Sequence, residues 1–318
     1  MRIKSIAIIA LISLGSFLGG YRGRDFINKN IYLPINSSIT KSKLLIKSYF
    51  DISHYKETKC PDESITIATF GQSNSVNGMT EQSDVAIPSN LYQYDWRSQK
   101  CYLYKEPLLG TDGVQGNVIT YTATKMANNF DRQIVIIPFG VGGTSVLEWA
   151  YGDLSHQHQI VLKRIKESGL YPRIFLWHQG EEDSNSSSAS LEQITKTPYF
   201  HAYYRLKGNR KGMIPLTEDI YYNALKTIVE STFKIFPQSS FGIALATRCM
   251  NEPWHPVRSA QRRVSNELPN SFLSADSDKI IGLEKRPDNC HFSAKGASEL
   301  GNLYYESITR EIKRNTGN

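Results

Sequence analysis

The sequence predicts an α/β fold, a three-layer α/β/α sandwich in which a central, mostly parallel sheet of five strands lies between two layers of helices. Short continuous runs rich in Ile, Val and Phe are typical of strands that are covered on both faces. Between these runs lie segments with apolar residues at intervals of three and four, the pattern of amphipathic helices. Alternation of the two patterns predicts a doubly wound parallel sheet in a single domain.

Each predicted element has its own sequence signal. The predicted strands are the apolar runs 64–70, 133–139, 173–179, 240–247 and 271–276. The predicted helices are the periodic segments 158–169, 217–236, 255–268 and 293–312. Thr217 is a candidate N-cap, because a threonine side chain can accept a hydrogen bond from a free N–H at a helix start.

The chain before this domain has a different composition. Residues 1–20 predict a signal peptide or an N-terminal membrane anchor, with an apolar stretch from 6 to 20 after a basic start. These fifteen residues would rise about 22 Å as a helix, short of a full membrane span. No clean A-x-A cleavage site follows, so an uncleaved anchor stays an alternative. Residues 21–60 are expected to form a leader or tether, and residues 61–318 the domain.

The positive charge of the chain is confined to its first 50 residues. The whole sequence carries a net charge of +7, and residues 1–50 hold eight basic residues against one acidic residue. The remaining 29 basic and 29 acidic residues cancel. A domain without net charge lacks the basic face that nucleic acids require, so no nucleic-acid partner is expected.

Four widely spaced cysteines are consistent with disulfides in an oxidising compartment. They include no C-x-x-C, so a zinc ribbon or a redox dithiol is not expected. Of the three possible connectivities we favour Cys60–Cys101 with Cys249–Cys290, while buried free thiols stay an alternative. No metal and no cofactor are predicted.

Polar and small residues follow four of the five predicted strands. These exits read GQSN (71–74), GVGGTS (140–145), HQGEED (178–183) and DNCHFS (288–293). Parallel strands deliver their carboxyl ends to one edge of the sheet, where α/β proteins bind ligands. Taken alone, Ser73 could be an ordinary cap residue. An α/β-hydrolase is not favoured, because Ser75 stands where its G-x-S-x-G motif has the last glycine. A Walker A loop is excluded, because the glycine loop has no lysine.

Asp288 and His291 are spaced i, i+3, which lets a carboxylate accept from one imidazole nitrogen while the other faces outward. A serine nucleophile needs such a base, because its hydroxyl is almost never ionised at neutral pH. The alternative interpretation is that this pair only caps the start of a helix.

Together these motifs, in this order, resemble the SGNH hydrolase superfamily, whose fold is flavodoxin-like. They are most similar to its sialic-acid-specific and carbohydrate acetylesterase branch, which includes carbohydrate esterase family six. The resemblance runs from about Ser64 to Tyr305. Ser75 stands where this branch usually has a methionine, so the wall beside the serine differs.

The resemblance implies roles for individual residues. Ser73 would be the nucleophile, His291 the general base and acid, and Asp288 the residue that orients His291. The oxyanion would be held by the N–H groups of Ser73 and Gly143 and by the side-chain amide of Gln179. Supporting residues around these groups would be Gln72, Asn74, Gly142, Glu181 and Arg258.

The expected function is that of an exported serine esterase, which removes O-acetyl groups from a sialic acid, a polysaccharide or another glycan through an acetyl-serine. Segments 92–107 and 184–212 are rich in aromatic residues, which suit stacking on sugar rings. Trp96, Trp149 and Tyr199 are the predicted sugar-binding aromatics. An O-acetyltransferase acting on an envelope polysaccharide and a non-catalytic glycan-binding protein are the alternatives.

Overall fold

The computed structural model describes residues 52–184, 216–250 and 252–316. The predictions for residues 1–20, for most of the leader and for Tyr199 lie outside the described residues. The compact unit that contains the described residues extends from Asp51 to Asn318.

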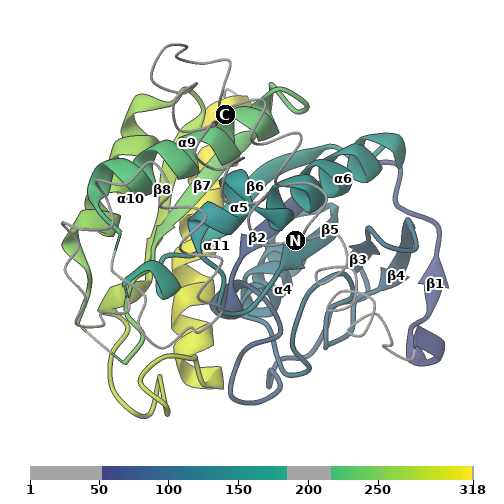
Figure 1. The fold of residues 1–318 in the computed structure, drawn as a ribbon. Helices are drawn as coiled ribbons and strands as arrows, with labels where there is room; N and C mark the ends of the chain where they lie inside the picture. Colours follow the sequence, from purple (N-terminus) through teal and green to yellow (C-terminus); the bar gives the residue numbers. More distant parts are fainter. Residues whose placement is uncertain (1–51, 185–215, 251, 317–318) are drawn as a thin grey trace, which may run out of the picture. The chain divides into compact units, whose positions relative to one another are not determined.

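The sheet contains the five predicted strands, and each of them pairs in parallel with its neighbours among the five (Figure 1). Each begins and ends within two residues of its predicted bounds. They are β2 (Ser64–Gly71), β5 (Gln133–Gly140), β6 (Pro172–His178), β7 (Ser240–Leu245) and β8 (Ser271–Asp276).

The predicted count of five strands was wrong, because the described sheet has eight, in the order β1-β4-β3-β5-β2-β6-β7-β8. The additional strands are β1 (Glu57–Thr58), β3 (Leu91–Asp95) and β4 (Lys100–Leu103). β4 pairs antiparallel with both β1 and β3. These strands are two to five residues long and partly polar, so they lack the continuous apolar run that identified the others.

Residues 52–60 belong to the compact unit, although the predicted domain begins at residue 61. A short helix, Ile52–His54, precedes β1, and β1 pairs with β4 at the edge of the sheet. Cys60 is joined to Cys101 in β4 by a disulfide, as favoured from the sequence.

Helices cover both faces of the sheet and complete the predicted three layers. One face packs on α5 (Val146–Tyr151), α6 (Asp153–Glu167), α9 (Glu218–Phe233) and α10 (His255–Glu267). The other face packs on α4 (Ile119–Asn129) and α11 (Ala294–Thr316). Successive side chains along each strand point to opposite faces of the sheet and belong to two separate hydrophobic clusters. Both faces are buried, so the strand sequences are uninterrupted apolar runs.

The helix predictions were correct in place, although α9 ends three residues before the predicted 236 and α11 four residues after the predicted 312. α6 begins five residues before the predicted 158, and α4 and α5 were not predicted. The Thr217 prediction is confirmed, because its side chain accepts a hydrogen bond from Ile220 N at the start of α9.

Gly71 ends β2 at a position where the backbone of β6 comes too close for a side chain. Its φ is +144°, and a Cβ there would lie 2.0 Å from the carbonyl oxygen of His178. The next residue, Gln72, donates its N–H to that same oxygen at 3.1 Å. A glycine at the strand exit therefore lets β2 turn tightly against β6.

Replacing Gly71 with alanine should destabilise the fold far more than the same change at Gly169. Gly169 also has a positive φ, +79°, but no atom lies within 4 Å of its hypothetical Cβ. Gly169→Ala should cost about 1–2 kcal/mol for backbone conformation alone, and Gly71→Ala about 3–5 kcal/mol because backbone must also move. Urea unfolding would measure both, and equal losses would show that the contact with His178 is unimportant.

Candidate active site

Ser73 begins a single 3₁₀ turn, Ser73–Ser75, directly after β2, and it is partly exposed. The buried residue Gln72 holds this turn in place. Gln72 Oε1 accepts a hydrogen bond from Glu182 N at 3.2 Å, and Ser75 Oγ donates to Gln72 O at 2.8 Å. Gln72 thus fixes the predicted nucleophile turn to the loop after β6.

Asp288 and His291 form the predicted hydrogen bond. The Nδ1 of His291 lies 2.7 Å from Asp288 Oδ2, and Asp288 Oδ1 accepts from the N–H groups of Cys290 and His291. Partial burial opposes ionisation of Asp288, but these hydrogen bonds outweigh it and lower the pKa of the carboxyl. An ionised Asp288 can orient the ring of His291 and stabilise its protonated form.

The residues on either side of His291 are bonded to the segment that carries Ser73. Asn74 Nδ2 donates to Cys290 O at 3.3 Å, and Thr80 N donates to Phe292 O at 2.9 Å. These contacts bring the two predicted catalytic segments together at the carboxyl edge of the sheet. Within the described residues, no hydrogen bond joins the Ser73 hydroxyl to His291, and such contacts are often long before substrate binds.

Glu181 supports Asn74 and does not contact His291. It is 1% exposed, and its Oε1 lies 2.8 Å from Asn74 Nδ2 and 3.1 Å from His178 Nε2. Burial favours the neutral acid, but the charge of His178 and the hydrogen bonds from His178 and Asn74 lower the pKa of Glu181 to about 2. A buried carboxylate therefore holds the Asn74 side chain in the orientation that reaches Cys290 O.

The glycine loop after β5 passes close to Ser73. A Cβ at Gly142 would lie 3.7 Å from the Cβ of Ser73, so there is no room for a large side chain between them. Gly143 has a φ of +62°. Among the described residues, no acceptor is bonded to the N–H of Ser73 or to that of Gly143, so both groups are available to a ligand.

The prediction that the Gln179 side chain donates to an oxyanion was wrong. Gln179 is fully buried, and its Nε2 donates to Thr144 O at 2.9 Å and to Asp183 Oδ2 at 2.7 Å. Both N–H bonds of the amide are thus used inside the protein. Gln179 instead positions the glycine loop through Thr144.

The buried carboxyl of Asp183 is a second support of the same loop. Its Oδ2 accepts from Gln179 Nε2 and, at 2.9 Å, from Val146 N at the start of α5. Burial raises the pKa of Asp183 to about 7, although hydrogen bonds from Ser145, Val146 and Gln179 partly oppose the rise.

Neither described tryptophan of the predicted sugar site is available for stacking. Trp96 is 6% exposed and Trp149 only 1%. Trp96 Nε1 donates to Gly110 O, and Trp149 Nε1 donates to Thr144 Oγ1 at 3.0 Å. Both rings pack on Phe139 in the core, because their apolar surface is better buried there than against water.

Arg258, predicted to support the site, lies in a separate ion-pair cluster. Its guanidinium binds Asp276 at the end of β8 and Asp278 in the following turn. Asp278 in turn accepts from Thr247 N and Arg248 N at 2.8 Å after β7. Arg258 therefore fastens the exits of β7 and β8 to each other.

Sequence reasoning missed Arg286, which supports the His291 loop. The side chain is 2% exposed and donates to the carbonyl oxygens of Ser277, Ile280 and Cys290. It also lies over the ring of Phe292 at 3.9 Å. A lone arginine in a loop carries no sequence signal for such a role, because its partners are backbone atoms.

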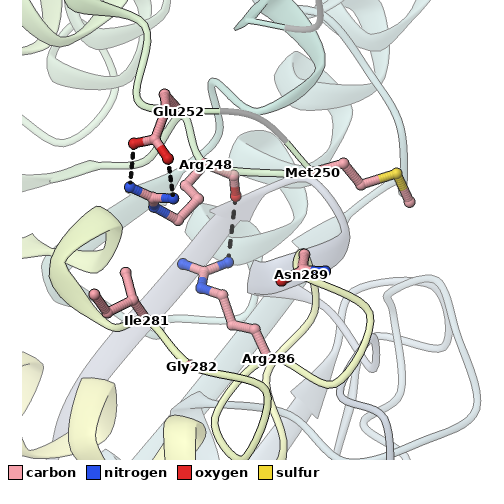
Figure 2. A pocket seen from close by; sticks show the side chains of 7 residues that line it. All are labelled: Arg248, Met250, Glu252, Ile281, Gly282, Arg286 and Asn289. Atoms are coloured by element: carbon pink, nitrogen blue, oxygen red, sulfur yellow. Dashed lines mark hydrogen bonds and ion pairs between the residues drawn. The ribbon is translucent and has the colours of Figure 1, made fainter.

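A cavity of about 510 Å³ lies beside this loop. Figure 2 shows the guanidinium of Arg248 facing the carboxylate of Glu252, while the guanidinium of Arg286 donates to the carbonyl oxygen of Arg248. The described residues that line it do not include Ser73 or His291. The cavity is therefore next to the predicted catalytic loop and separate from its reacting groups.

The second predicted disulfide, Cys249–Cys290, is confirmed. It ties the residue before His291 to the loop after β7. Both disulfides join residues 41 positions apart, so each should restrict the unfolded chain to the same extent.

This equality makes the two disulfides a matched pair. The Cys60→Ser/Cys101→Ser and Cys249→Ser/Cys290→Ser variants should each lose about 2–4 kcal/mol of unfolding free energy. Only the second should also lower kcat, by about 10–100-fold, because it frees the loop of His291. Ester hydrolysis measured at a temperature where both variants are folded would test this, and equal kcat values would count against it.

Asp183 should make stability depend on pH. Its folded-state pKa is raised from 3.8 to about 7, so the folded protein holds a proton that the unfolded chain releases. Stability should therefore fall as pH rises from about 4 to about 7, by at most about 4 kcal/mol. Asp183→Asn should remove this decline in urea unfolding at a series of pH values. A difference between variant and wild type that stays constant with pH would contradict the prediction.

Comparison with known proteins gives one family match. Residues 69–204 match the model of a family described as carbohydrate esterase, sialic acid-specific acetylesterase. A search of curated proteins gives no match.

Two solved structures share the fold. A protein from Arabidopsis thaliana has a TM-score of 0.54 and 17% identity, over 78% of this chain and 98% of its own. A carbohydrate acetylesterase from Xanthomonas citri has a TM-score of 0.50 and 13% identity, over 77% of this chain and 55% of its own. The predicted resemblance to the sialic-acid-specific and carbohydrate acetylesterases is confirmed over residues 69–204, and the chain is a carboxylic ester hydrolase.

Proposed function

We propose that this protein is an exported carbohydrate O-acetylesterase that acts through an acetyl-serine intermediate on Ser73. The observation that carries the proposal is the hydrogen bond between Asp288 and His291, on a loop whose neighbouring residues are bonded to the Ser73 segment. An oriented imidazole beside a serine at a strand exit is the arrangement that activates a hydroxyl for acyl transfer.

In the proposed mechanism, His291 Nε2 takes the proton of Ser73 as Oγ attacks the acetyl carbon. The resulting oxyanion would be held by the N–H groups of Ser73 and Gly143, which have no acceptor among the described residues. His291 would then protonate the departing sugar alcohol. Water, activated by the same imidazole, would release acetate and restore Ser73.

The substrate class is supported by the matched family and by the Xanthomonas protein, which is named as a carbohydrate acetylesterase. An O-acetyl group on a glycan is therefore the proposed target. Sialic acids, named in the family description, are one candidate for the sugar, and other acetylated polysaccharides are also candidates.

Export is supported by the two disulfides, since such bonds persist in oxidising compartments. Residues 6–20 stay the predicted export or anchoring segment. No helix among the described residues is long and apolar enough to cross a membrane.

Ser73→Ala should lower kcat for acetyl esters by a factor on the order of 10⁵–10⁶, because no other group would form the acyl-enzyme. Ser75→Ala is the matched control on the same turn. Among the described residues its hydroxyl donates to Gln72 O alone, so its removal should change kcat by less than about tenfold.

Hydrolysis of 4-nitrophenyl acetate and acetate release from acetylated sialic acids, xylans and capsular glycans would be measured for wild type and both variants. Comparable activity of Ser73→Ala and wild type would refute the role of Ser73. Wild-type protein that cleaves the nitrophenyl ester but no sugar ester would refute the proposed substrate class.

A further inference from the structure

We infer that Asp112 determines the specificity of this site by accepting hydrogen bonds from free hydroxyl groups of the sugar that carries the acetyl ester. The inference rests on the proposed function and concerns a residue that the sequence motifs did not indicate.

Asp112 lies beside the predicted oxyanion site. Its Oδ2 accepts from Gly142 N at 3.3 Å. A Cβ placed on Gly142 would lie 3.6 Å from that oxygen and 3.7 Å from the Cβ of Ser73. Only the width of one small residue therefore separates the carboxylate from the nucleophile. A sugar whose acetyl group is attacked by Ser73 would therefore lie within reach of Asp112.

The carboxylate is held by a rigid backbone. Asp112 N donates to Gly140 O at 3.2 Å, at the end of β5, and Asp112 O accepts from Asn77 N at 3.1 Å. Asp112 Oδ1 accepts from Gly113 N at 2.9 Å. These bonds fasten Asp112 to both the glycine loop and the segment after Ser73. A side chain that is fixed in this way can distinguish ligands by geometry, since little ordering is needed on binding.

The charge of Asp112 does not assist ester cleavage. A negative group near a developing oxyanion opposes the charge that forms there, and His291 already has Asp288 as its partner. A carboxylate is, however, a strong acceptor for neutral hydroxyl donors and can accept from two neighbouring hydroxyls. Recognition of a polyhydroxylated leaving group explains a carboxylate at this position, whereas catalysis does not.

The guanidinium of Arg97 lies close enough to interact with the charge of Asp112, and it is placed over the ring of Trp96 at 5.2 Å. Burial lowers the pKa of Arg97, and the charges of Asp95 and Asp112 partly offset this. The carboxylate of Asp112 thus lies near a guanidinium as well as beside the glycine loop.

Asp112→Asn tests the inference with three esters. The first is a methyl glycoside with one acetyl group, the second is the same glycoside fully acetylated, and the third is 4-nitrophenyl acetate. Glucose, xylose and N-acetylneuraminic acid would supply the glycosides. Only the first ester offers free sugar hydroxyls.

For the monoacetylated glycoside, kcat/KM relative to 4-nitrophenyl acetate should fall by about 10–100-fold in Asp112→Asn, the effect of losing hydrogen bonds to a charged group. The same ratio for the fully acetylated glycoside should change by less than about threefold. Asp131→Asn, at an exposed turn before β5, is the matched control and should alter neither ratio.

Equal losses for all three esters would overturn the inference, because they would mean that Asp112 only positions Gly142. Full activity of Asp112→Asn on all three esters would also overturn it. Both results require that wild type cleaves the monoacetylated glycosides. If wild type cleaves none of them, the proposed function fails instead. Activity on 4-nitrophenyl acetate shows in each case that the variant is folded.

Discussion

The arrangement of the site depends on the side-chain amide of Asn74. It donates to Glu181 on one side and to the carbonyl oxygen of Cys290 on the other, and so it joins the exits of β2 and β6 to the loop of His291. The ionised Glu181 fixes the amide, because a buried carboxylate needs its hydrogen bonds. Besides this bridge, the two predicted catalytic segments, more than 200 residues apart in sequence, are joined in the described structure by the bonds of Thr80 to Phe292 O and of Ala294 N to Glu81.

Most polar residues at the strand exits hold loops in place and do not face a ligand. Gln72 and Gln179 are buried and bonded to neighbouring loops, and Trp149 supports Thr144 from the core. This follows from the cost of burying an unpaired polar group, which requires every such side chain to find a partner. Among the described residues, the groups left for a substrate are few: the hydroxyl and N–H of Ser73, the N–H of Gly143, the outer edge of His291 and, by our inference, the carboxylate of Asp112.

Much of the fold could be predicted from the sequence, because buried parallel strands and amphipathic helices have distinctive periods. β2, β5, β6, β7 and β8 were found in this way, and so was the Thr217 cap of α9. β1, β3 and β4 were missed, since they are only two to five residues long and mix polar with apolar residues. α5 was missed because six residues are too few to show a helical period.

By itself, the sequence determined the parallel α/β sheet and the Asp288–His291 pair, since spacing of three residues on one loop suffices for that contact. It also placed Ser73 at a strand exit. Only the tertiary structure decided the direction of each polar side chain. The amide of Gln179 turns inward to Thr144 and Asp183, and Asp112 comes to lie across Gly142 from Ser73. The partners in these contacts belong to different loops, so no local sequence pattern could specify them. They were fixed by the need of buried polar groups to form hydrogen bonds in the folded interior.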